Sequence, residues 1–202
     1  MRRVLGLAAG LLLTSTALAP VAPAAAAPAG TARDAAACRT AAGKCERDPF
    51  IGITVKVRAT PVARAGGKVT YVVDYSQVWT PSFAPYWGAF WVGGRFPAGA
   101  RGPARAVLYD TAGKRLAVLP CRRHADGTWC DAHVQMPHQG RVVMTVRLPA
   151  AARGKAAARL GFDSFETLNE AEYARHYGRK RLREKFCEFR FTKTATTRVV
   201  AG

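Results

Sequence analysis

Acidic residues are scarce in this chain of 202 residues. It has 13 Asp and Glu against 31 Lys and Arg, and its formal net charge is +18. A balance this positive disfavours cationic partners and favours anionic ones, such as wall polymers, nucleic acid or acidic lipid, although it also serves solubility. Charge alone does not choose among these partners.

Catalytic signatures are also absent from the sequence. The four histidines form no nucleophile elbow, zinc-protease motif or phosphate loop; they stand at positions 124, 133, 138 and 176. Asp163 and Glu166 are a close carboxylate pair before the C-terminal segment, but glycosidase carboxylates must face each other across a cleft. A zinc site built from Cys121, Cys130, His133 and His138 would lack the tight ligand spacing of structural sites. We therefore expect a non-catalytic protein without metal or cofactor.

Long apolar runs are missing as well, apart from one near the N-terminus. Arg2 and Arg3 precede an apolar run at 4–13 and then small residues, which is the three-part pattern of a secretory signal. The run is too short for a spanning helix, which needs about 20 apolar residues. Two A-x-A motifs, the small-residue pattern that precedes a signal-peptide cleavage site, predict cleavage between Ala24 and Ala27. Residues 1–26 are thus expected to be a signal peptide, and the mature protein to be secreted and extracellular.

All five cysteines lie after this signal, in the compartment where disulfides persist. Cys121 and Cys130 bracket Asp126-Gly127, a strong hairpin-turn signal, so their thiols should face each other across paired strands. Two arrangements remain open for the others. Either Cys38 bonds to Cys45 and leaves Cys187 free, or Cys187 bonds to one of those two.

Short segments of period two follow a polar linker at 27–49. Apolar and polar residues alternate at 51–58, 69–76 and 141–148, and Gly, Pro and Asp turns separate the segments. This spacing is typical of an all-β antiparallel sandwich, with a barrel as the second choice. We expect the sandwich to cover residues 50–165 and a basic helix with a terminal strand to form residues 166–202.

Five motifs in this region occur in a familiar order. They are KVTYVV at 68–73, RFPAG at 95–99, the segment from Cys121 through Trp129-Cys130, GRVVMTVRL at 140–148 and GKAAARL at 154–160. In this order residues 50–165 resemble the immunoglobulin-like repeat domain of bacterial surface proteins, a catalogued domain of unknown function. The resemblance implies an immunoglobulin-like sandwich, extracellular display and structural or adhesive roles, with no catalytic residues to carry over. The chain departs from the pattern where an aromatic insert replaces the polar turn after the second strand.

That insert lies within a stretch from Tyr71 to Phe96 that holds three of the four tryptophans. Core packing is the first interpretation of so many aromatic side chains. Pro81, Pro85 and Gly88 nevertheless interrupt any strand in its middle, which predicts a loop with exposed rings. The candidate ligand-binding residues are Trp79, Phe83, Tyr86, Trp87 and Trp91.

The C-terminal segment contains a dense basic run. Asn169 and Glu172 resemble a capping box that begins a helix, and only Glu184 opposes the basic residues between 175 and 185. The run is either a solvated charged face or a contact surface for an anionic polymer. The candidate contact residues are Arg175, Arg179, Lys180, Arg181, Arg183 and Lys185.

These observations favour a secreted, non-catalytic immunoglobulin-like protein with a binding or structural role at the bacterial cell envelope or outside the cell. Its expected partner is an anionic cell-wall polymer, a glycan or another surface protein, and not a specific nucleic acid. Two alternatives stay open: a small secreted hydrolase of unrecognised type, and a glycan-binding module that uses the aromatic insert. A cleft that pairs a histidine with a carboxylate would favour the enzyme.

Overall fold

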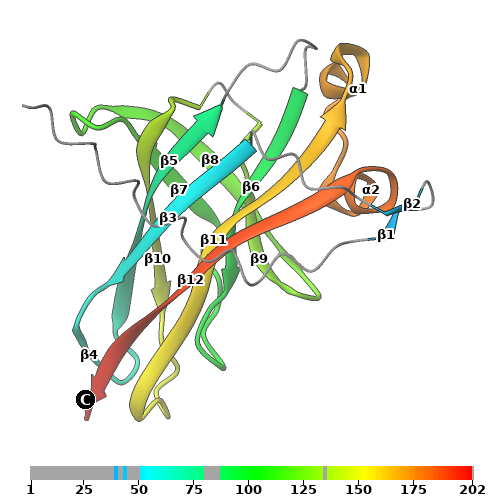
Figure 1. The fold of residues 1–202 in the computed structure, drawn as a ribbon. Coiled ribbons are helices and arrows are strands. Elements are labelled where there is room, and N and C mark those ends of the chain that lie inside the picture. Colours follow the sequence, from blue (N-terminus) through cyan, green and yellow to red (C-terminus); the bar gives the residue numbers. More distant parts are fainter. Residues whose placement is uncertain (1–38, 41–42, 45–50, 80–86, 134–135, 202) are drawn as a thin grey trace, which may run out of the picture. The chain divides into compact units, whose positions relative to one another are not determined.

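The strands of this protein form two packed layers (Figure 1). The structure is a computed structural model that describes residues 39–40, 43–44, 51–79, 87–133 and 136–201. These residues belong to one compact unit, Arg33–Gly202. No helix within the described ranges is long and apolar enough to cross a membrane.

The first layer contains four antiparallel strands. Their order is β3 (Ile51–Ala59), β5 (Lys68–Trp79), β10 (Gln139–Arg147) and β7 (Arg105–Tyr109). On β10 the residues Val142, Met144 and Val146 are buried, while Arg141 and Arg147 are exposed. The inner face predicted from period two is therefore confirmed on this strand.

The second layer carries the longest strand. Its order is β9 (Gly127–Asp131), β6 (Trp87–Arg95), β11 (Gly154–Leu168), β12 (Cys187–Val200) and the short β4 (Val62–Arg64). β4 runs parallel to β12, and the other pairs are antiparallel. β8 (Arg115–His124) pairs with β7 through its first half and with β9 through its second half, so it joins the two layers.

This strand order is that of an immunoglobulin domain. Without β4 and the β8–β9 hairpin, the layers read β3-β5-β10-β7 and β6-β11-β12, which are the ABED and CFG sheets in chain order. The predicted immunoglobulin-like antiparallel sandwich is thus confirmed. The sandwich also continues past Phe165, because β12 pairs with β11 from Glu166 back to Gly154.

Two short helices connect β11 to β12. They are α1 (Glu170–Ala174) and α2 (Arg179–Lys185). Both hydrogen bonds of the predicted capping box are present: the Glu172 backbone N–H donates to Asn169 Oδ1, and the Asn169 N–H donates to Glu172 Oε2. Near the N-terminus, β1 (Arg39–Thr40) and β2 (Gly43–Lys44) form a separate two-stranded pair.

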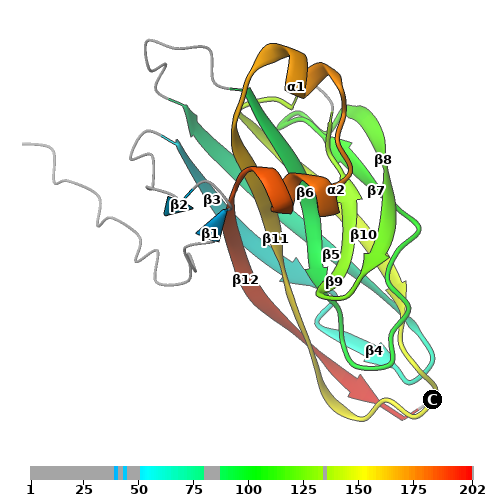
Figure 2. The same ribbon diagram turned by 90° about the vertical axis from the view of Figure 1, so that its right-hand side faces the viewer.

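The apolar side chains form two cores. The larger core lies between the layers and includes Tyr71, Leu108, Met144 and Phe162. The smaller core lies on the outer face of the second layer, where α2 covers it (Figure 2). Its buried members are Ala89, Trp91, Trp129, Phe165, Leu168, Leu182 and Phe186. A sheet face that an open sandwich would leave to solvent is therefore partly buried here.

Glycines allow close backbone approach where β9, β6 and β11 meet. Gly93 lies opposite Trp129 on β9 and Gly161 on β11. Gly93 has a φ of +152°, and a Cβ added there would overlap the carbonyl oxygen of Thr128. A residue with a side chain is excluded at this position by both conformation and space.

A disulfide closes the β8–β9 hairpin. Cys121 and Cys130 are bonded and lie directly opposite each other, as the Asp126-Gly127 turn predicted. Cys187 is also disulfide-bonded, and its partner lies outside the described residues. The arrangement in which Cys187 stays free is therefore wrong.

Replacing Cys121 and Cys130 together with alanine is expected to lower the free energy of unfolding by about 2–3 kcal/mol, because the bond restricts the unfolded chain. The sandwich should still form, since both residues remain in paired strands. Urea denaturation of the parent and the double variant measures the difference. A variant as stable as the parent would show that the bond contributes nothing beyond local geometry.

Candidate functional site

The outer face of the second layer carries a row of charged and aromatic side chains. Asp131, Trp91, Asp163 and Arg190 are successive Cα partners across β9, β6, β11 and β12. Partners in neighbouring strands share a face, so these four side chains lie in one row across the sheet. α2 lies over this row.

Arg179, the first residue of α2, lies at the centre of a buried ionic network. Its side chain is 1% exposed. It donates to Asp126 through both terminal nitrogens, at 2.8 Å each, and to Asp163 through Nε at 2.8 Å. Its guanidinium also lies 4.4 Å from the centre of the Trp129 ring. The helix is thus attached to the sheet through a charge as well as through apolar contact.

Two further arginines complete the network. Arg183 Nε donates to Glu188 at 3.0 Å, and Arg190 Nε donates to the same carboxylate at 2.9 Å. Both arginines also pair with Asp126. Three arginines therefore balance the carboxylates of Asp126, Asp163 and Glu188, which lie on three separate segments of the chain.

The pKa values of two carboxylates in the network are shifted in opposite directions. Burial raises the pKa of Asp163 to about 7 against the charge of Arg179, and the neighbouring Glu188 adds to the rise. Burial would also raise the pKa of Asp126, but its hydrogen bonds and charge contact with Arg179 outweigh burial and hold it well below the usual range. Asp126 is therefore firmly ionised, whereas Asp163 exchanges its proton near neutral pH.

A cavity of about 600 Å³ opens beside this network. Its walls come from β6, β8 and β9 on the sheet and from the segment that contains α2. The lining residues are Trp91, Pro120, Arg122, His124, Asp131, His176, Gly178, Arg179, Lys180, Arg181 and Glu184. We call this space the basic cavity.

The basic cavity holds positive charge that no carboxylate in the described part of the chain neutralises. Arg179 is committed to the network, and Arg181 pairs with Glu184 at 3.1 Å. Arg122 and Lys180 have no carboxylate partner within the described part of the chain. An anionic group that enters the cavity would therefore meet two cations whose charge is still available.

His124 and Trp91 form an aromatic wall of the cavity. Their rings meet edge to face, with centres 5.8 Å apart. Burial and the charge of Arg179 lower the pKa of His124, which keeps its imidazole neutral at neutral pH. Its Nε2 is buried and has no hydrogen-bond partner among the described atoms.

His176 lines the cavity and contacts a second histidine, His133. His176 Nε2 is 2.7 Å from Asp131 Oδ2, and the His176 ring contacts the His133 ring at 3.8 Å between centres. His133 also stacks on Tyr173 at 4.3 Å. No three His, Cys, Asp or Glu side chains converge as metal ligands in the ranges that the structure covers. The cavity wall thus pairs a histidine, His176, with a carboxylate, Asp131. The sequence did not indicate this pairing.

The predicted aromatic platform is only partly described. Trp91 is 5% exposed and belongs to the smaller core, so it lines the cavity but is not an exposed ring. Phe83 and Tyr86 lie outside the described residues. Only the backbone is described for Trp79, which ends β5, and for Trp87, which begins β6.

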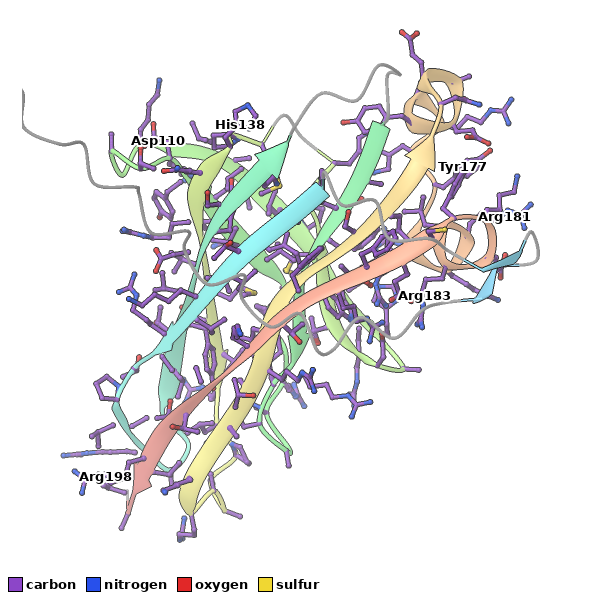
Figure 3. The ribbon with its side chains drawn as sticks, viewed as in Figure 1. Asp110, His138, Tyr177, Arg181, Arg183 and Arg198 are labelled. Carbon is purple, nitrogen blue, oxygen red and sulfur yellow. A yellow bond between two sulfur atoms is a disulfide. The ribbon has the colours of Figure 1, made fainter. Side chains whose placement is uncertain are left out.

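One member of the predicted basic run, Arg179, is not exposed, whereas Arg181 and Arg183 lie at the surface of α2 (Figure 3). Arg179 is buried and cannot contact a polymer, because carboxylates from distant segments surround it. Arg183 shares two of those carboxylates, and Arg175 donates to the Tyr177 hydroxyl. Lys185 lies over the Tyr177 ring at 5.4 Å. Lys180 and Arg181 are the members of the run that line the cavity.

Sequence reasoning missed Arg122 and His124. Both precede the Asp126-Gly127 turn by an even number of residues, so their shared face was visible in the spacing. Their position beside α2 was not visible, because it depends on the pairing of β8 with β9 and of β9 with β6.

Comparison with known proteins gives fold neighbours only. No protein family and no curated protein matches the chain. Among solved structures, the collagen-binding subdomain ACE19 of the Enterococcus faecalis surface protein ACE is 9% identical with a TM-score of 0.39, and the match covers 76% of this chain and 99% of that one. A non-cellulosomal cohesin from Archaeoglobus fulgidus is 9% identical with a TM-score of 0.36, over 73% of this chain and 92% of that one.

A third neighbour, a PapD-like domain of human CEP192, is 12% identical with a TM-score of 0.35, over 78% of this chain and 92% of that one. At these values the fold assignment rests on the strand order described above. The ligands of these neighbours are not transferred to this chain.

Proposed function

We propose that this chain is an exported, non-catalytic binding domain and that it holds an anionic glycan in the basic cavity. The observation that supports this function is the available charge of Arg122 and Lys180 beside the aromatic wall of Trp91 and His124. An acidic sugar presents a carboxylate to such cations and an apolar ring face to such a wall. A cavity of about 600 Å³ has the size of a ligand pocket.

Export is the second part of the proposal. The N-terminal pattern of charged, apolar and small residues supports it, as do the disulfide of the β8–β9 hairpin and the bonded state of Cys187. We place the protein at the cell envelope or outside the cell, where acidic polymers are available. A fractionation of the producing cells, with the N-terminus of the mature chain sequenced, tests this location.

Changing Arg122 and Lys180 together to glutamine is expected to weaken binding of an acidic oligosaccharide at least tenfold. Two charge-assisted hydrogen bonds are lost, each worth about 1.5–3 kcal/mol. Titration calorimetry with oligogalacturonate measures the affinity. The matched control changes Lys56 and Lys114, two exposed lysines on other parts of the sandwich, to glutamine.

The control variant should bind like the parent protein. If both double variants lose affinity equally, net charge and not the cavity governs binding. If neither variant loses affinity, the cavity is not the glycan site. Melting temperatures of the two variants should match that of the parent, because all four residues lie at the surface or line an open cavity.

A hydrolase is the second candidate function, and the contact between His176 and Asp131 favours it. A histidine oriented by a carboxylate can act as a general base on water. No Ser, Thr or Cys lines the cavity in the described ranges, so a covalent route through such a residue has no support there. Release of new reducing ends from polygalacturonate by the parent protein, lost in His176→Gln, would favour the enzyme over the binding domain.

A further inference from the structure

The outer face of the second layer continues beyond α2 toward the C-terminal end of β12, and its character changes there. The exposed side chains on this part of β4, β6, β11 and β12 include Arg64, Arg95, Lys155, Arg159 and Arg198. We call this set the cationic face. It contains no Asp or Glu among the described residues.

Burial of the intervening residues shows that this face points away from the core. Ala156 and Ala158 are buried between exposed neighbours on β11, and Ala195 and Thr197 are buried in the same way on β12. On β4, Ala63 is buried while Arg64 is exposed. The basic side chains therefore leave the sheet on its solvent side.

The strand register places like charges directly opposite each other. Lys155 is the Cα partner of Arg198, and Arg95 is the Cα partner of Arg159. Like charges in directly opposite positions destabilise a sheet. Lys155 and Arg198 have no carboxylate partner within the described residues. The pair of Lys155 and Arg198 costs stability and has no counter-charge among the described residues, and an anion outside the protein would supply one.

The shape of the face selects the kind of anion. The face is an open sheet surface and not a pocket, with strands about 4.8 Å apart and same-face residues about 6.7 Å apart along each strand. Thr194 and Thr196 lie on it beside Arg198 and add hydroxyl donors. Evenly spaced guanidinium, ammonium and hydroxyl donors suit an extended chain that carries one phosphate per repeating unit.

We propose that the cationic face binds a linear phosphodiester polymer of the cell envelope. This goes beyond the proposed glycan site, because Arg198 lies at the opposite end of β12 from Arg181 and Arg183 on α2 (Figure 3). The basic cavity and the cationic face can therefore be changed independently. One would select a ligand, and the other would hold the domain on an anionic matrix.

The test uses the mature protein and poly(glycerol phosphate) as the probe. The variant Arg64→Gln, Lys155→Gln and Arg198→Gln is compared with a control of equal charge change, Lys56→Gln, Lys114→Gln and Arg115→Gln, whose residues are exposed on other segments. We expect the face variant to bind at least tenfold more weakly at moderate salt. Its dependence of log affinity on log salt should also be shallower, because fewer counterions are released.

Three results would overturn the proposal. The control could lose as much affinity as the face variant, which would assign binding to net charge. The face variant could bind as tightly as the parent. Polygalacturonate could bind the face as well as poly(glycerol phosphate) does, which would exclude selection of phosphate. The cavity variant Arg122→Gln and Lys180→Gln should keep its affinity for poly(glycerol phosphate), so failure of the glycan proposal and failure of this one give different results.

Discussion

Replacing Arg179 with methionine is expected to destabilise the fold by about 3–5 kcal/mol, the range measured when one partner of a buried ion pair is removed. The side chain is 1% exposed, and it holds Asp126 and Asp163 together beneath α2. Methionine would fill part of the space but would leave those carboxylates without their central counter-charge. Urea denaturation of both proteins measures the loss.

The effect of Arg179→Met should depend on pH. The pKa of Asp163 in the folded protein is already raised from 3.8 to about 7 by burial, so the folded state binds this proton more tightly than the unfolded state. Its contribution to stability is therefore greatest below the unfolded pKa and is lost as pH rises through about 7. Without Arg179 the pKa of Asp163 rises further, so the variant should lose more stability at pH 8 than at pH 5.

The control for this prediction is Arg181→Met. Arg181 lies on the same helix, its side chain is 55% exposed, and its pairing with Glu184 lies at the surface. Its replacement should change stability by less than about 0.5 kcal/mol. Equal changes in stability from the two substitutions would mean that the buried network contributes no more to the free energy of unfolding than a surface ion pair does.

Replacing Gly93 with alanine is expected to cost about 3 kcal/mol or more. The backbone at φ +152° disfavours any side chain, which costs roughly 1–3 kcal/mol. The added methyl would also overlap the Thr128 carbonyl, and relieving that overlap would disturb the pairing of β6 with β9. Thermal unfolding followed by circular dichroism measures the change.

Substitutions at two other glycines distinguish the cost of backbone conformation from the cost of steric overlap. Gly113 has a φ of +85° with open space around it, so Gly113→Ala should show only the conformational cost. Gly52 has an ordinary φ and open space, and Gly52→Ala should be nearly neutral. If Gly93→Ala costs no more than Gly113→Ala, the close approach of β6 to β9 does not contribute.

The sequence was sufficient to predict those features of the fold that depend on a local signal. Alternation of Val142, Met144 and Val146 with polar residues predicted β10 and its inner face, and the Asp126-Gly127 turn predicted the bond between Cys121 and Cys130. In the first case the alternating residues lie on one strand. In the second case the turn that brings the two cysteines together lies between them in the sequence. The antiparallel sandwich followed because several such strands occur at regular spacing, and its immunoglobulin-like character followed from the resemblance of residues 50–165 to the repeat domain of bacterial surface proteins.

The candidate site could not be predicted in this way, because its parts are distant in the chain. Arg179 lies 16 residues from Asp163 and 53 from Asp126, and within its own segment it looks like one more exposed charge. α2 buries only Arg179 and Leu182, which is too few positions to mark a buried helix face. The cationic face likewise needs the register that places Lys155 beside Arg198.

The parallel pairing of β4 with β12 determines how the domain responds to mechanical force. Val62 lies beside Arg198 and Arg64 lies beside Val200, with backbone bonds from Arg198 N–H to Pro61 O and from Ala65 N–H to Val200 O. Tension between Val62 and Val200 pulls the two strands in opposite directions along their common axis. Shear of this kind loads all the hydrogen bonds between them at once, whereas an antiparallel edge would peel apart one bond at a time. The domain can therefore carry a pulling load between these two strands before β12 separates from the sheet.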